Sequence, residues 1–164
     1  MDGESLLTSA IEVGIALAGF SGIVAVLDQR RQGGWRNADK LRLQLLLQTS
    51  FSAVLFSMLP LFLVSMRLMP SSVWRLSSGI WLIYIAIEIP FRIRQVARFQ
   101  KEAPEPVPRP YAAFMISGLL VTVAVQLFNA ASLGQAWPHL LTIIWAIILA
   151  LTQFVRLLRE IWQE

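Results

Sequence analysis

Residues 111–162 read YAAFMISGLLVTVAVQLFNAASLGQAWPHLLTIIWAIILALTQFVRLLREIW. Two long apolar runs in this segment, 111–133 and 139–162, are separated only by Gly-Gln-Ala-Trp-Pro. A helix needs about 20 mostly apolar residues to cross the hydrocarbon core of a membrane. Proline is tolerated in the first turn of a helix, so Pro138 can begin the second run. The segment therefore predicts a tight hairpin of two transmembrane helices.

Three further apolar runs precede this hairpin, at 6–27, 43–66 and 73–94. The chain of 164 residues is 56% hydrophobic and 15% charged, whereas a soluble domain is about 45–50% apolar and about 25% charged. This difference indicates a surface that faces lipid. We expect an all-α fold, a polytopic bundle of five transmembrane helices that forms one domain over residues 1–164.

The basic residues are distributed unevenly around the five runs. Of the 14 lysines and arginines, only Arg67 and Arg75 lie on the side that holds the second and fourth connections. The positive-inside rule then places the N-terminus outside and the C-terminus in the cytoplasm. The chain begins Met-Asp-Gly-Glu, which lacks the basic start of a signal peptide, so we expect the first run to be retained as a span.

Several classes of function are disfavoured by composition. The net charge of +4 does not indicate nucleic-acid binding, because the basic residues flank apolar runs. Cysteine is absent and His139 is the only histidine, so we expect no metal centre and no cofactor. The three aspartates, Asp2, Asp28 and Asp39, lie outside the runs and no nucleophile–base pair is evident, so we do not expect an enzyme.

The first and third connections contain most of the unusual loop sequence. The third includes residues 103–110, Ala-Pro-Glu-Pro-Val-Pro-Arg-Pro, whose alternating prolines favour an extended strap. Such a strap is either a plain spacer or, together with the first connection, a docking segment for a cytoplasmic protein.

Polar residues inside the runs mark the candidate permeation or ligand-binding site, because such groups are costly in lipid. At 100° per residue, the polar residues of the third, fourth and fifth runs each fall on one stripe, which predicts that the three stripes converge. By depth they divide into an outer and an inner layer. For Glu88 an ordinary ion pair with Arg92 is the alternative, and Arg156 can instead extend to the interface. The candidates are Glu12, Gly19, Tyr84, Glu88, Gln126, Asn129, Gln153 and Arg156.

Glu12 is the most distinctive candidate. In a dry bundle its carboxyl would be neutral and hydrogen-bonded between helices, whereas in a wet vestibule it would be charged and attract cations. Gly19 lies on the same face, and Gly14, Ala18 and Gly22 form a series of small residues that permits close helix contact. We therefore expect this helix at the centre of the bundle or at a subunit interface.

The segment Leu-Ala-Gly-Phe-Ser-Gly-Ile-Val-Ala-Val at 17–26, followed by Trp35 and by Ser-Met-Leu-Pro at 57–60, resembles small bacterial membrane proteins of uncharacterised families. The resemblance covers about the first third of the chain. It implies a multi-pass protein of the bacterial inner membrane and carries no known activity. The length and span count are also similar to those of the translocator-protein family of porphyrin and sterol binders, but the tryptophan-proline-rich connection of that family is absent.

Two functions are compatible with these features. The first is an oligomeric, channel-like cation conduit in which a ring of Glu12 side chains lies near the symmetry axis. The alternative is a membrane-embedded accessory or small-ligand-binding subunit without transport activity. The expected partners are the lipid bilayer and, in the first case, further copies of the chain.

Overall fold

The computed structural model describes residues 3–29, 37–102 and 108–163. Each of the five α-helices is long and apolar enough to span a membrane, which confirms the predicted all-α transmembrane fold. The first and third connections, with their predicted docking segments, fall largely outside the described residues. The elements are α1 (Gly3–Gln29), α2 (Asn37–Ser65), α3 (Pro70–Glu102), α4 (Arg109–Phe128), a π-helical turn η1 (Asn129–Leu133) and α5 (Ala136–Gln163).

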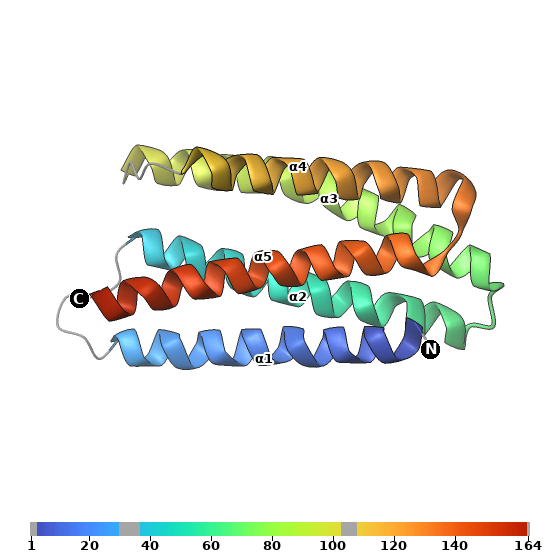
Figure 1. Ribbon diagram of the computed structural model, residues 1–164, viewed down its shortest axis with the longest axis horizontal. Helices are drawn as coiled ribbons and strands as arrows, with labels where there is room; N and C mark the ends of the chain where they lie inside the picture. Colours follow the sequence, from blue (N-terminus) through green and yellow to red (C-terminus); the bar gives the residue numbers. More distant parts are fainter. Residues whose placement is uncertain (1–2, 30–36, 103–107, 164) are drawn as a thin grey trace.

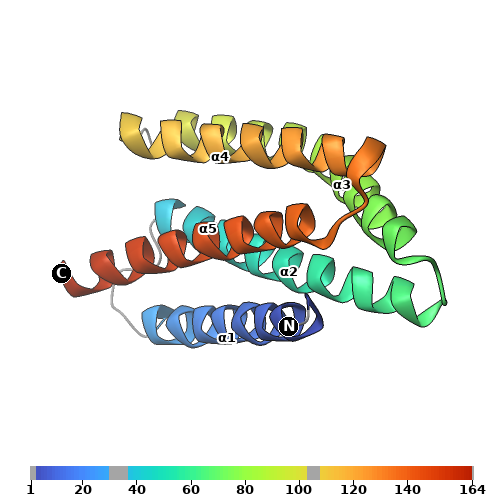
Figure 2. The same cartoon turned by 45° about the vertical axis from the view of Figure 1, so that its right-hand side comes forward.

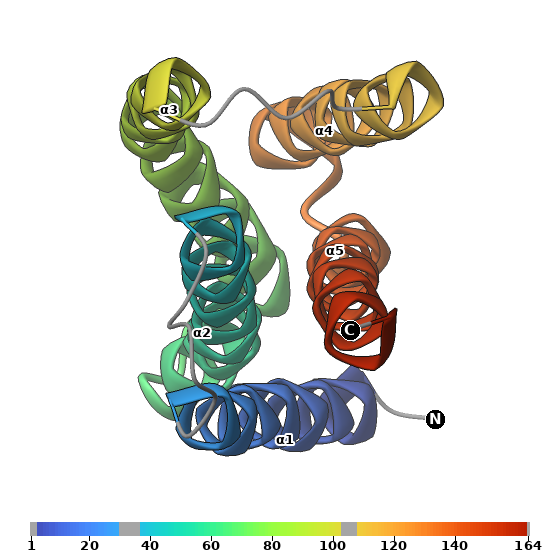
Figure 3. The same ribbon diagram turned by 90° about the vertical axis from the view of Figure 1, so that its left-hand side faces the viewer.

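The helices are stacked in three tiers (Figure 1): α1 on one side, α2 with α5 in the middle, and α3 with α4 on the other side. The view along the bundle in Figure 3 separates the same tiers. We call the end where α1, α3 and α5 finish the basic end, because Lys40, Arg94, Arg98, Arg109 and Arg159 lie there.

The apolar core lies between α1, α2 and α5. One cluster joins Leu17 of α1, Leu46 of α2 and Leu157 of α5, all of which are buried. A second cluster, nearer the other end, joins Leu7 of α1 to Ile143 of α5. These three helices therefore form a packed unit that can hold the rest of the bundle.

The α3–α4 pair is attached more loosely. Only 11% of an apolar 18-residue stretch of the α4 span (Arg109–Leu133) is buried, against 44% of such a stretch in the α2 span. Figures 1 and 2 show α3 beginning beside the end of α2 and running away from it toward the basic end. Because α3 and α4 diverge from α2 and α5 in this direction, the basic end is where cavities can form between the two pairs.

A glycine sets the closest approach of α1 to α2. A Cβ atom added to Gly14 would lie 2.6 Å from Cγ2 of Val54 and 3.2 Å from the carbonyl oxygen of Ser50. By contrast, a Cβ atom at Gly22 would meet nothing within 4 Å. The predicted series of small residues therefore serves the α1–α2 contact at Gly14 but not at Gly22.

The turn between α4 and α5 is held by one side chain. Asn129 accepts a hydrogen bond from the backbone N–H of Gln135 (2.9 Å) and donates to its carbonyl (3.1 Å). It also donates to Oγ of Ser78 on α3 (2.8 Å). Gly134 adopts a left-handed conformation, φ 60°, which favours glycine. The α4–α5 hairpin predicted from the sequence is thus closed by Asn129 and fastened to α3.

Candidate functional site

A space lined by four helices lies between the diverging helix pairs. A cavity of about 570 Å³ is lined by residues from α2, α3, α4 and α5 near the basic end. We call it the arginine cavity because Arg42, Arg92 and Arg156 line it. The remaining wall is mostly apolar and includes Ile93 and Met115.

A second, inner cavity of about 210 Å³ continues from the first toward the middle of the bundle. The two share Arg92, Met115 and Ile116 in their walls, so they are adjacent, and we call them together the crevice. The inner wall is largely apolar, with Trp81 and Trp145 among its residues. The crevice is therefore lined by three arginines near the basic end and, at depth, by Glu88, Arg92 and mostly apolar side chains.

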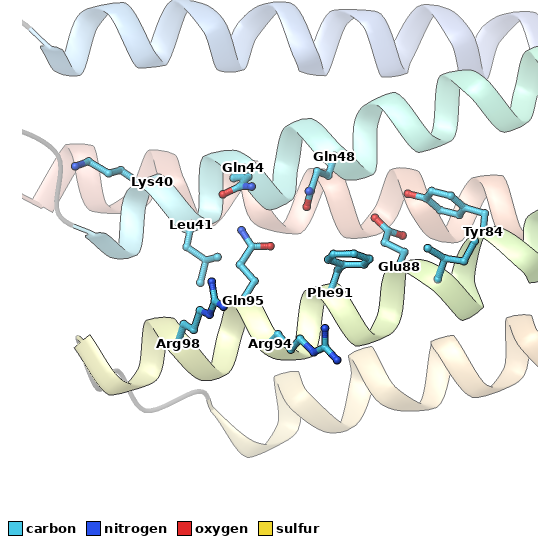
Figure 4. A pocket seen from close by; sticks show the side chains of 11 residues that line it. Lys40, Leu41, Gln44, Gln48, Tyr84, Glu88, Phe91, Arg94, Gln95 and Arg98 are labelled. Atoms are coloured by element: carbon cyan, nitrogen blue, oxygen red, sulfur yellow. The ribbon is translucent and has the colours of Figure 1, made fainter.

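A third cavity, of about 790 Å³, lies between α2 and α3. Figure 4 shows Gln44 and Gln48 of α2 facing Glu88 and Gln95 of α3 across it. It shares Leu41 with the arginine cavity, and Tyr84 and Glu88 with the inner cavity. Lys40, Arg94 and Arg98 line it toward the basic end, so the approach to the crevice is also rich in positive charge.

Hydrogen bonds hold the polar side chains of the crevice in place. The hydroxyls of Ser52 and Tyr84 bond to each other and join α2 to α3. Arg92 donates through Nη2 to Oε1 of Glu88, one turn earlier, at 2.7 Å. On the facing helices, Gln153 donates through Nε2 to the hydroxyl of Tyr111.

The tyrosine of α4 also supports a guanidinium group. The Cζ atom of Arg156 lies 4.5 Å from the centre of the Tyr111 ring, a cation–π contact. Tyr111 thereby orients both Gln153 and Arg156, and all three line the arginine cavity. These contacts preorganise the charged end of the crevice.

Three buried polar atoms in the walls of the three cavities have no hydrogen-bond partner in the described part of the chain. They are Nε of Arg92, Nε1 of Trp145 and Oε1 of Gln48. Buried polar atoms in folded proteins are almost always paired with protein or water. Two donors of the crevice walls and one acceptor of the α2–α3 cavity therefore lack the partner that buried polar atoms usually have.

Four of the eight residues predicted from the sequence line this crevice. Tyr84 and Glu88 line the inner and α2–α3 cavities, and Gln153 and Arg156 line the arginine cavity. The predicted stripes of α3 and α5 therefore both line the crevice.

Gln126 and Asn129 lie elsewhere, in a buried polar cluster at the end opposite the basic end. Both side chains are fully buried. Gln126 donates through Nε2 to Oγ1 of Thr142 (2.9 Å), so the stripes of α4 and α5 meet here. The same Nε2 lies 3.5 Å from Nδ1 of His139. The amide groups of both predicted residues are thus largely engaged in joining helices.

His139 occupies a position created by a proline. Pro60 has no N–H, so it leaves the carbonyl of Phe56, four residues earlier, without its helical donor. Nε2 of His139 lies 2.9 Å from that carbonyl oxygen. Because a carbonyl only accepts, Nε2 carries the proton and Nδ1 is left to accept from Gln126. The lone histidine therefore completes the backbone of α2.

Glu12 and Gly19 are not part of the crevice. Both lie on the exposed face of α1, on the side away from α2 and α5. A Cβ atom at Gly19 would meet nothing within 4 Å, so this face is open around it. The prediction left open whether Glu12 packs within its own subunit, and the structure places it outward.

Sequence reasoning missed several residues of the crevice. Arg92 is predicted to lie on the polar stripe of the third run and to pair with Glu88, but it is not among the predicted site residues, and neither are Tyr111 and Trp145. A guanidinium group inside a predicted span was an available signal for Arg92. The role of Tyr111 had no such signal, because an aromatic residue at the start of a span is ordinary.

Comparison of the chain with protein-family models, curated proteins and solved structures gives no match. Within residues 3–29, 37–102 and 108–163, no group of three or more metal-binding side chains comes together. The site is therefore described by its geometry alone. The arginine cavity lies near the basic end, and the mostly apolar inner cavity lies next to it, toward the middle of the bundle.

Proposed function

We propose that this chain is a membrane-embedded binding protein that holds a small amphipathic molecule in the crevice between α2–α5 and α3–α4. The observation that carries this proposal is the distribution of charged side chains: three arginines line the arginine cavity, whereas the inner cavity is lined by the Glu88–Arg92 pair and otherwise by neutral, mostly apolar side chains. Ligand pockets are typically about 300–1,000 Å³ and mostly apolar, with a few fixed polar groups. The unpartnered polar atoms of the walls also support a bound molecule.

The proposed setting is a bacterial inner membrane with the basic end in the cytoplasm and the N-terminus outside. The concentration of lysine and arginine at the basic end supports this orientation. Arg92 lies six residues before Arg98, where the α3 span ends, which corresponds to a depth of about 9 Å. The charged chamber would therefore lie near the head groups of the cytoplasmic leaflet, and the inner cavity would lie among the acyl chains.

Mass spectrometry of molecules that co-purify with the protein in detergent tests this function. We expect wild type to retain an amphipathic molecule, and Ala146→Leu to lose it because the added carbons fill the inner cavity that Ala146 lines. The matched control is Ala16→Leu on the exposed face of α1, which should retain the molecule. Equal retention by both variants would place the molecule outside the crevice and refute the proposal.

A second candidate function is an oligomeric cation conduit with a ring of Glu12 near its axis. The exposed position of Glu12 favours it, because a carboxyl on the outer face of a span is costly in lipid unless another helix or water covers it. Gly19 on the same face would permit close approach of a second copy.

Cation flux into proteoliposomes tests the conduit. Wild type should conduct, and Glu12→Gln should lose cation selectivity, whereas Glu4→Gln at the start of the same helix should not. A protein that is monomeric by cross-linking and conducts nothing would eliminate this candidate and leave the binding function in place.

A further inference from the structure

The arginine cavity is unusual for a space inside a membrane bundle because of its charge. Two of the three arginines that line it, Arg92 and Arg156, come from different helices and face the same chamber. None of the residues that the structure describes as lining it is an aspartate or a glutamate. Charged groups within a span are rare and are usually paired with one another. Because Glu88 is paired with Arg92, the guanidinium group of Arg156 supplies the positive charge that an anion would balance.

The local contacts leave this charge available. Arg92 is paired with Glu88 through Nη2, but its Nε has no partner among the described residues. Arg156 contacts the face of the Tyr111 ring, which orients the guanidinium group without neutralising it. A guanidinium group binds carboxylate and phosphate through parallel N–H donors, so two such groups facing one chamber suit an oxyanion.

We infer that the ligand of the crevice is an anionic amphiphile, whose carboxylate or phosphate head group binds between Arg92 and Arg156 and whose acyl chain enters the inner cavity. This inference rests on the proposed function and adds the chemical class of the ligand. The inner cavity accepts the chain because its wall, including Trp81, Leu119 and Leu149, is largely apolar.

The approach to the chamber favours the same class of ligand. Lys40, Arg94 and Arg98 line the neighbouring α2–α3 cavity at the basic end. Basic residues at this level attract anionic lipids. Positive charge thus extends from the surface of the bundle to the arginine cavity.

Binding of three dodecyl compounds to the detergent-purified protein tests the inference: dodecanoate, dodecyl phosphate and uncharged dodecanol. Titration calorimetry in a non-ionic detergent measures each affinity, and inorganic phosphate serves as the anion without a chain. We expect both anionic amphiphiles to bind at least about tenfold more tightly than dodecanol, since a charge-assisted hydrogen bond contributes about 1.5–3 kcal/mol. Inorganic phosphate should bind more weakly than dodecyl phosphate.

Two independent variants locate the head group. Arg92→Gln and Arg156→Gln should each weaken binding of the anionic amphiphiles about tenfold and leave dodecanol unchanged. Arg159→Gln is the matched control, because it removes the same charge from α5 one turn away at an exposed position that lines no described cavity. Circular dichroism establishes that each variant is folded, and Arg92→Lys provides a second test at that position, since it keeps the charge and loses the planar fork.

The outcomes separate the inference from the function on which it rests. Equal affinities for dodecanol and the two anionic amphiphiles would overturn the inference that the ligand has an anionic head group, and would leave the proposed binding function in place. Failure of all three dodecyl compounds to bind would overturn both. If inorganic phosphate binds as tightly as dodecyl phosphate, the dodecyl chain contributes nothing to the affinity. That result would overturn the inference that the ligand is an amphiphile. If Arg156→Gln and Arg159→Gln lose the same amount of affinity for the anionic amphiphiles, the effect comes from the overall charge of the protein. That result would overturn the proposed head-group site.

Discussion

Replacing His139 by phenylalanine removes the donor that serves the backbone of α2 next to Pro60 while keeping an aromatic ring beside Trp74. The carbonyl of Phe56 then remains buried without a partner, which costs about 1–3 kcal/mol. The contact between Gln126 and the ring is also lost, and side-chain hydrogen bonds between membrane helices average about 0.6 kcal/mol. We expect His139→Phe to lower the free energy of unfolding by about 2 kcal/mol.

The contact of His139 with the backbone carbonyl next to Pro60 also predicts that substitutions at these two positions are coupled. In Pro60→Ala the new backbone N–H of residue 60 can bond to the Phe56 carbonyl, so the loss caused by His139→Phe should shrink to that of the Gln126 contact. The two substitutions should therefore be coupled by about 1–2 kcal/mol in a double-mutant cycle. The cycle cancels the packing change that removing the buried Pro60 ring produces by itself.

Reversible unfolding in mixed micelles, titrated with an ionic detergent and followed by tryptophan fluorescence, provides these free energies, since the chain has six tryptophans. Pro90→Ala is the control, because Pro90 is exposed on another helix and should be additive with His139→Phe. A coupling of less than about 0.5 kcal/mol for the Pro60 pair, within the ordinary error of additivity, would refute the account of His139.

Three further substitutions test the packing of the bundle by the same unfolding assay. Gly118→Ala would place its Cβ 1.9 Å from the Trp145 ring, so it should cost about 1–3 kcal/mol and change the shape of the inner cavity, measured as altered ligand affinity. Gly14→Ala should cost a similar amount through the α1–α2 contact, whereas the control Gly79→Ala meets nothing within 4 Å and should be neutral or stabilising. Asn129→Ala should cost about 2–3 kcal/mol because it removes three hydrogen bonds, and a loss below about 0.5 kcal/mol would contradict its role in the turn.

The span pattern follows from sequence because the membrane imposes it. A helix that crosses the hydrocarbon core must be apolar over a fixed length, and its charges must collect at the ends, so both features are local and countable. The tight turn before Pro138 likewise depends only on neighbouring residues. Even the stripe of Tyr84 and Glu88 is a local property, because the helical period alone places the two side chains on one face.

Which face of each span points inward required the tertiary structure. In water the buried face of a helix is the apolar one, but in a membrane lipid and core are both apolar, so hydrophobicity does not distinguish them. Gly14 and Gly22 therefore look equivalent in the sequence, although only Gly14 packs against α2.

The partnerships between distant residues were also decided by the tertiary structure. Pro60 predicts an unpaired carbonyl in α2, but only the packing of α5 on α2 shows that His139 supplies the donor. The arginine cavity also depends on tertiary structure, because Arg92 lies on α3 and Arg156 on α5, with the whole of α4 between them in the sequence. Local rules position residues along each helix, whereas the divergence of α3 and α4 from the packed unit creates the space that these side chains share.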